Sequence, residues 1–137
     1  MALLFANNNS LSEITALPSS ISGGAMTLLA TQTASGSANL SFTSGIDSTY
    51  DSYVFKFINI HPATDSVNFY VNFSVDGGSN YNVTKTTTWF YAYHNESGST
   101  SSLEYNAGLD LAQSTANQPL MENIGNDNDQ SGSGFLT

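Results

Sequence analysis

The side chains that could carry out chemistry are few and well separated in this sequence. His61 and His94 are the only imidazoles. Neither lies at a short metal-ligand spacing from the other or from paired acids. The chain has no cysteine, which excludes disulfides and thiolate ligands. Serine is abundant, but no Gly-x-Ser-x-Gly elbow marks a nucleophile. We therefore expect no catalytic residue, no metal site, no cofactor and no enzymatic activity.

Two acidic motifs look like site motifs but favour turns. The stretch Ser74–Tyr81 resembles the Asp-box of sialidase-type propellers, and a single copy predicts a stable hairpin turn rather than a hydrolase. The stretch Asp127–Gly132 places oxygen side chains at alternate positions before a glycine, as at the start of a calcium loop. The bidentate acid that should close such a loop would fall beyond Thr137, so we favour a solvated turn.

The densest aromatic cluster runs from Trp89 to Tyr93. Aromatic platforms bordered by amides hold sugars in many β-proteins, so Trp89, Tyr91 and Tyr93 are candidate glycan contacts. A strand also sends alternate side chains to opposite faces, and these rings could instead fill a core and cover a subunit interface. We favour core and interface packing and keep glycan contact as the alternative.

Charge excludes one class of partner outright. The 137 residues include 11 acids against 2 bases, which gives a formal net charge of −9. Nucleic-acid binding needs lysine and arginine to displace counterions, and Lys56 and Lys85 are all that this chain offers. Anionic membrane surfaces are disfavoured for the same reason, and no membrane insertion is expected. The length predicts a single folded core.

The start of the chain differs from the rest. Residues 1–24 carry apolar residues at helical spacing, followed by a Gly-Gly breaker, and predict a short helix or extended arm. The candidate attachment residues of this arm are Leu11, Ile14 and Leu17. The arm could dock on a neighbouring subunit or cap a strand. Residues 25–137 then form the β domain, which we expect to continue beyond Thr137.

Period-two alternation dominates the β domain. It predicts strands at 26–33 and 38–43 around a Ser35-Gly36 turn, and a central strand at 53–60 that is apolar on both faces. After a turn at 61–65, the alternation over 67–75 predicts a hairpin with 81–86 through the turn at 76–80.

The second half is predicted to hold shorter elements. Residues 87–94 are rich in strand formers, and a turn at 95–99 leads to short strands or a bend at 103–105 and 108–112. Residues 113–134 read as a long ordered loop anchored by Leu120, Met121 and Ile124, and a new strand begins near 134. The fold class is all-β. An antiparallel sandwich or jelly roll is favoured over a closed barrel, because loop lengths are uneven and one strand is apolar on both faces.

Several stretches, in the same order, resemble a module found in structural proteins of tailed phages, with phages of marine cyanobacteria as the best match. The resemblance starts near Leu11 and covers most of the chain. The stretches that carry it are residues 42–50, 59–65, 76–84, 110–115 and 125–131. Proteins with this module are tail fibres, other tail appendages or virion proteins, and no catalytic residues come with it.

The resemblance therefore implies a virion protein that is made in the host cytoplasm. We expect a tail fibre or tail appendage subunit that forms a homo-oligomer, as a trimer, and contacts other virion proteins of the tail or head. One alternative is a capsid decoration or head-fibre protein. A further alternative is a carbohydrate-binding receptor module that contacts a host surface glycan through Trp89, Tyr91 and Tyr93.

Overall fold

The structure is a computed structural model, and it describes residues 26–137. The chain divides into two units, Met1–Gln32 and Thr33–Thr137. The described part of the first unit, residues 26–32, is exposed and has no regular secondary structure. The predicted arm at 1–24, with Leu11, Ile14 and Leu17, lies outside the described residues.

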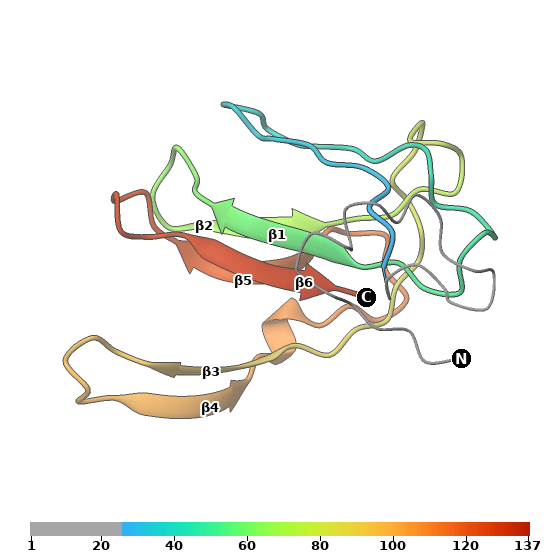
Figure 1. The fold of residues 1–137 in the computed structure, drawn as a ribbon. Helices are drawn as coiled ribbons and strands as arrows, with labels where there is room; N and C mark the ends of the chain where they lie inside the picture. The colour runs from blue at the N-terminus through green and yellow to red at the C-terminus, as the bar shows by residue number, and fades with distance from the viewer. Residues whose placement is uncertain (1–25) are drawn as a thin grey trace, which may run out of the picture. The chain divides into compact units, whose positions relative to one another are not determined.

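The second unit is all-β, as the alternation predicts. Its described residues form antiparallel two-stranded sheets that pair β1 with β6, β2 with β5, and β3 with β4 (Figure 1). A 3-10 turn, η2 (Ala107–Leu109), follows β4. The strands are β1 (Phe55–Ile60), β2 (Val67–Val71), β3 (Phe90–His94), β4 (Ser101–Tyr105), β5 (Gln118–Ile124) and β6 (Gly132–Leu136).

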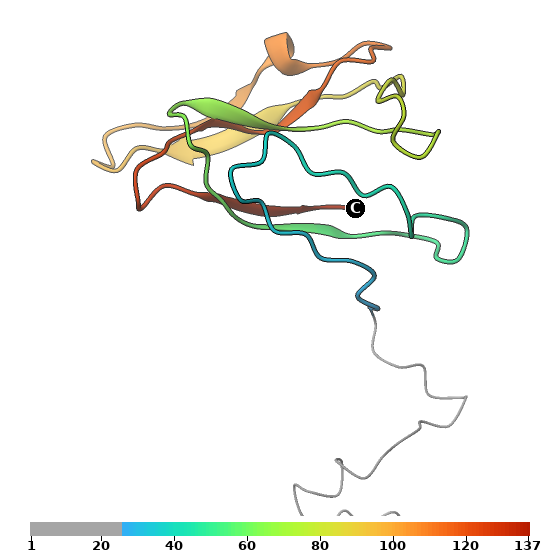
Figure 2. The same cartoon turned by 90° about the horizontal axis from the view of Figure 1, so that it is seen from above.

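The β1·β6 and β2·β5 ladders are two parts of one long antiparallel pairing. It starts at Phe55 opposite Leu136 and runs along β1 and β6 to Ile60 opposite Gly132. After the loops at 61–66 and 125–131 it resumes with Val67 opposite Ile124, and it ends at Val71 opposite Gln118. Both views show β1 beside β6 (Figures 1 and 2). The first strand of the described residues is thus paired with the last one.

A matching bulge fixes the register of each ladder. In β1, Asn59 is an extra residue opposite Ser133, and in β5, Asn123 is an extra residue opposite Asn68. Both bulge asparagines have a positive φ of 53°, a conformation that asparagine tolerates better than most residues. The Asn59 amide donates to Ser133 Oγ at 3.0 Å, and the Asn123 amide donates to Asn68 Oδ1 at 2.9 Å. These side chains replace the ladder bonds that the bulges interrupt.

Apolar contacts join the two ladders. The Phe57 ring of β1 meets the Phe69 ring of β2 edge-on, with centroids 5.0 Å apart. Met121 of β5 fills the space beside Gly132 of β6, where a Cβ would collide with its sulfur. Within the described residues, however, Ile124 is the one large aliphatic or aromatic side chain that is buried. The core of the single chain is therefore small.

A buried polar network connects β2 and β5 to the segment that precedes β3. Lys85 Nζ donates to Asn72 Oδ1 at 2.6 Å and to the Val83 carbonyl at 2.9 Å. Thr87 Oγ1 donates to Gln118 Oε1, and Gln118 Nε2 also donates to the Leu109 carbonyl of η2 at 3.3 Å. No buried side-chain nitrogen or oxygen of the described residues lacks a hydrogen bond, as expected for groups whose burial would otherwise be costly.

The hairpin predicted for 67–75 and 81–86 forms only next to its turn, where the Val83 amide donates to the Phe73 carbonyl at 3.4 Å. The strand ends at Val71 and pairs with β5, and residues 81–86 form no strand beyond a bridge between Lys85 and Ser114. The Asn72 side chain explains the change, because its Nδ2 donates to the Tyr81 carbonyl at 3.0 Å and takes an acceptor that a ladder would use. The predicted turn at 76–80 is present.

Three further predictions about elements are corrected. Residues 26–33 and 38–43 form no strands, since alternation makes a strand only where a partner completes the ladder. The strand predicted as central, β1, is paired with β6 alone within the described residues. The predicted loop at 113–134 contains β5 and the start of β6. Its predicted anchors, Leu120, Met121 and Ile124, all lie in β5.

Candidate interaction surfaces on the β3 and β4 hairpin

The β3 and β4 strands form a regular hairpin because their turn is tightly hydrogen-bonded. The Asn95 amide donates to the Thr100 carbonyl at 2.9 Å, and the Thr100 amide donates to Asn95 Oδ1 at 3.0 Å. Gly98 supplies the positive φ of 67° that the turn requires. The register then runs without a shift from Phe90 opposite Tyr105 to His94 opposite Ser101.

One face of this hairpin, the front face, carries the predicted aromatic residues Trp89, Tyr91 and Tyr93. The structure brings them together with Glu104, which lies directly opposite Tyr91. The Tyr91 hydroxyl donates to Glu104 Oε2 at 3.0 Å, and the Tyr93 hydroxyl donates to Glu104 Oε1 at 3.4 Å. A single carboxylate from β4 therefore holds two aromatic side chains of β3.

The front-face rings also contact one another. The Trp89 and Tyr91 centroids are 5.0 Å apart at an interplanar angle of 46°, and the Tyr91 and Tyr93 rings stack at 5.7 Å and 24°. Tyr91 is therefore contacted by a ring on each side. A sugar that stacks on an aromatic platform needs a free ring face, and Tyr93 is the exposed end of this row.

The pKa of Tyr91 is raised above its ordinary value. The main cause is the hydrogen bond to Glu104, with smaller contributions from burial and from the negative charges of Glu104 and Glu122. The Tyr91 phenol is therefore protonated at neutral pH, and it donates a hydrogen bond rather than acting as a base.

The opposite face, the back face, is apolar and open. Phe90, Leu103 and Tyr105 project from it and are 69%, 75% and 62% exposed. The Tyr105 hydroxyl donates to Asp110 Oδ2, and this hydrogen bond is the main cause that raises the pKa of Tyr105. The apolar part of the Tyr105 ring remains in contact with water. Exposed apolar side chains that lie next to one another make the back face a candidate interaction surface.

His94 could be recognised in the sequence as a candidate site residue, whereas Glu104 could not. His94 ends β3, and its Nδ1 lies 3.3 Å from the carbonyl oxygen of the next residue. Glu104 was not predicted as a site residue. Its position follows from the turn length and the hairpin register, so the signal is present in the sequence only once β4 is correctly paired with β3.

The Asp-box motif forms a closed turn. Ser74 Oγ donates to Asp76 Oδ1 at 2.6 Å, and the Asn80 amide donates to the same oxygen at 2.9 Å. The hydrogen bonds from Ser74 and Asn80 lower the pKa of Asp76 to about 2. Gly78 has a φ of 89°, and a Cβ there would collide with Thr43. The carboxylate is used to hold the turn.

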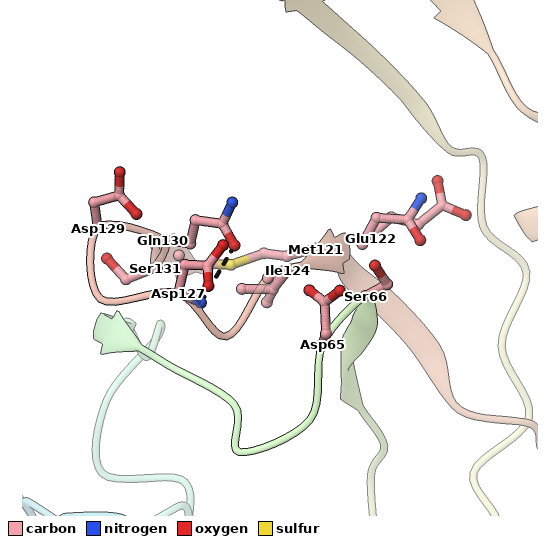
Figure 3. Close-up of a pocket in the computed structure, with 12 residues that line it drawn as sticks. Asp65, Ser66, Met121, Glu122, Ile124, Asp127, Asp129, Gln130 and Ser131 are labelled. Carbon is pink, nitrogen blue, oxygen red and sulfur yellow. Dashed lines mark hydrogen bonds between the residues drawn. The ribbon is translucent and has the colours of Figure 1, made fainter. Parts of the chain in front are cut away.

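The calcium-like motif lies beside an open hollow of about 650 Å³ (Figure 3). Asp65, Glu122, Asp127 and Asp129 line it, but their carboxylates do not converge, and Asp129 and Glu122 lie at opposite ends in Figure 3. Among residues 26–137, no three acidic, histidine or cysteine side chains form a group that could hold a metal ion. His61 Nε2 lies 3.0 Å from the Asp127 carbonyl oxygen. This contact joins the loop at 61–66 to the loop at 125–131.

Comparisons with known proteins give no match. No family model, no curated protein and no solved structure matches the chain. Within the described part of the chain, no helix has the length and apolar character that are needed to cross a bilayer.

Proposed function

We propose that this chain is a structural protein of a tailed-phage virion, a tail fibre or tail appendage subunit that forms a homotrimer. The observation that carries the proposal is the open back face of the β3 and β4 hairpin, formed by Phe90, Leu103 and Tyr105. The assignment to a phage virion rests on the resemblance of several sequence stretches to phage structural proteins.

A subunit with this surface gains stability by association. Burying a leucine or phenylalanine side chain contributes roughly 1.5–3 kcal/mol, and only Ile124 among the described large apolar side chains is buried in the single chain. An isolated two-stranded hairpin is marginal in water. We propose that trimer contacts cover the back face, and that the predicted sandwich or jelly roll is completed by these contacts.

A structural role also agrees with how the polar groups are used. Asp76 holds a turn, Glu104 holds Tyr91 and Tyr93, and Asp47 accepts from the Thr49 amide at 2.8 Å. These carboxylates are committed to local hydrogen bonds. In the proposed virion role the chain has no catalytic activity, residues 1–24 attach the subunit to the tail, and other tail or head proteins are its neighbours.

A second candidate function is a carbohydrate-binding receptor module. The observation that favours it is the end of the aromatic row, where Tyr93 is 40% exposed and lies beside the exposed Glu104 carboxylate. An aromatic ring next to a hydrogen-bond acceptor suits a sugar with adjacent apolar and hydroxyl groups. This site would contact a host surface glycan.

The experiment that tests the virion proposal is a cryo-EM map of the phage particle that encodes this chain. The expected result is threefold density for the chain in a tail appendage. Density on the capsid surface would instead support the alternative of a decoration or head-fibre protein. Absence of the chain from purified particles, checked by mass spectrometry of the same sample, would overturn the proposal.

A further inference from the structure

A second apolar surface lies on the outer side of the β1·β6 sheet. Phe55 and Phe57 point inward. The centroid of the Phe55 ring lies 5.7 Å from that of Phe42, and the centroid of the Phe57 ring lies 5.0 Å from that of Phe69. The alternate residues of β1 therefore point away from these contacts. We define the outer face as Val54, Lys56, Ile58 and Phe135.

The outer face is exposed. Ile58 is 77% exposed, Phe135 is 74% exposed and Val54 is 42% exposed. Phe135 lies directly opposite Lys56 in the ladder, so the two side chains leave the sheet on the same face. A lysine beside exposed apolar side chains suits a partner that offers both apolar area and a carboxylate, because complementary charges fix the register of an interface.

Lys56 is the basic side chain that is available for such a contact. The chain has two basic residues of the lysine and arginine type. Lys85 is buried and donates to Asn72 and Val83. Lys56 is exposed and forms no ion pair or hydrogen bond within the described residues.

The net charge of the chain also bears on which partner the outer face can bind. Two copies with a formal net charge of −9 each repel one another, so a contact between them must keep their acids apart or pair an acid with a base. Strands β1 and β6 contain no Asp or Glu. A second copy offers 11 carboxylates, and the outer face offers a lysine and apolar area without adding a like charge.

We infer that the outer face of the β1·β6 sheet binds a second copy of this chain, and that Lys56 pairs with a carboxylate of that copy. The inference rests on the proposed function and names one of its subunit contacts. Ile58 and Phe135 supply the buried apolar area. Lys56 sets the orientation, because a charge pair that is surrounded by apolar groups strongly disfavours misaligned docking.

Zero-length carbodiimide cross-linking tests the inference directly, because it joins an amine to a carboxylate only when the two are in contact. Unlabelled and ¹⁵N-labelled full-length chains are refolded together, and native mass spectrometry establishes the number of chains and the presence of mixed-label oligomers. The expected product is a Lys56 peptide that is joined to an acidic peptide of the other label.

The outcomes separate this inference from the proposed function. Cross-links of Lys56 within one label only would show that the chain covers its own outer face and would overturn the inference. An oligomer without Lys56 cross-links would overturn the inference and leave the proposed function standing. A monomer in the same measurement would overturn both.

A charge-matched pair of variants gives a second readout. Lys56→Gln and Asn82→Asp each lower the net charge by one, but exposed Asn82 lies outside the outer face. We expect Lys56→Gln to raise the dissociation constant of the oligomer about tenfold, and Asn82→Asp to change it less than twofold. Equal effects of the two variants would show that only net charge matters, which would contradict a specific contact at Lys56.

Discussion

The two faces of the β3 and β4 hairpin come from the same ten residues, yet they are organised in opposite ways. On the front face, the Tyr91 and Tyr93 hydroxyls share Glu104, and the rings stack on one another. On the back face, Phe90 and Leu103 are largely exposed and make no such contacts with other residues of 26–137. The front-face side chains contact one another, whereas the back face is left open and is covered by a second subunit in the assembly that we propose. Aromatic content alone does not identify a binding surface, because rings that already pack against one another and form hydrogen bonds within the chain leave little area for a partner.

The strongest way to break this comparison is to place a charge on the back face. We expect Leu103→Asp to abolish assembly, because it removes roughly 1.5–3 kcal/mol of apolar burial and places an unpaired carboxylate in the interface. Sedimentation velocity would follow the loss of the oligomer. Thr100→Asp adds the same charge in the neighbouring turn and should leave assembly intact. If Leu103→Asp assembles like the wild-type chain, the back face is not an interface.

The front face should respond to substitution with a change in stability and titration rather than in assembly. Trp89→Ala removes the ring that contacts Tyr91, and we expect a lower melting temperature with the oligomer retained. The carbohydrate-binding alternative predicts something different, namely that the wild-type chain binds a glycan array and that Trp89→Ala abolishes this binding. We expect no saturable binding by either protein, and a glycan signal that depends on Trp89 would favour the receptor function.

Glu104→Gln should sharpen the account of the front face at alkaline pH. Because the folded-state pKa of Tyr91 is raised above 10.0, the linked stability is fully present below that pH and is lost as pH rises through the folded pKa. Glu104→Gln removes the negative charge and weakens the hydrogen bond that is the main cause of the raised Tyr91 pKa. The Tyr91 pKa should therefore fall toward its ordinary value in an ultraviolet titration. Glu96→Gln makes the same exchange in the turn and should leave the titration unchanged. An unaltered Tyr91 titration in Glu104→Gln would contradict the assignment.

The smallest effect is expected at the Asp-box turn, which lies away from both faces. The pKa of the Asp76 carboxyl is about 2, lowered from 3.8. The stabilising contribution of Asp76 is therefore present above pH 3.8 and is lost as pH falls through about 2. A carboxyl NMR titration should give a midpoint near the lower value. Asp76→Asn should lower the melting temperature by a few degrees at neutral pH and remove this part of the acid dependence. A midpoint at the ordinary value would show that the turn does not hold the carboxylate.

The sequence predicts local features of this fold better than its pairing. The alternation places β1, β2 and β3 close to their observed positions, and the Gly98 turn places β4. The partner of β1 is β6, which is far away in the sequence, and no local pattern encodes that ladder. β5 falls in residues 113–134, for which the Asn, Asp, Ser and Gly content predicts a loop. Its Pro119 is tolerated because β5 pairs on one side within the described residues.

The candidate sites show the same division. The clustering of Trp89, Tyr91 and Tyr93 could be predicted because residues two apart in a strand share a face. Glu104 could not be predicted without the register of the hairpin. In the sequence, Lys56 stands out only as one of two basic residues. Its position opposite Phe135 becomes visible only when β6 is paired with β1.

Native mass spectrometry of the 137-residue chain tests the central claim most directly, because the claim is that the fold of this subunit is complete only when it is assembled. The account predicts a species of three chain masses, each chain being 14.5 kDa, that dissociates to monomer in the Leu103→Asp variant. A stable wild-type monomer at micromolar concentration, with the same melting temperature as Leu103→Asp, would contradict it.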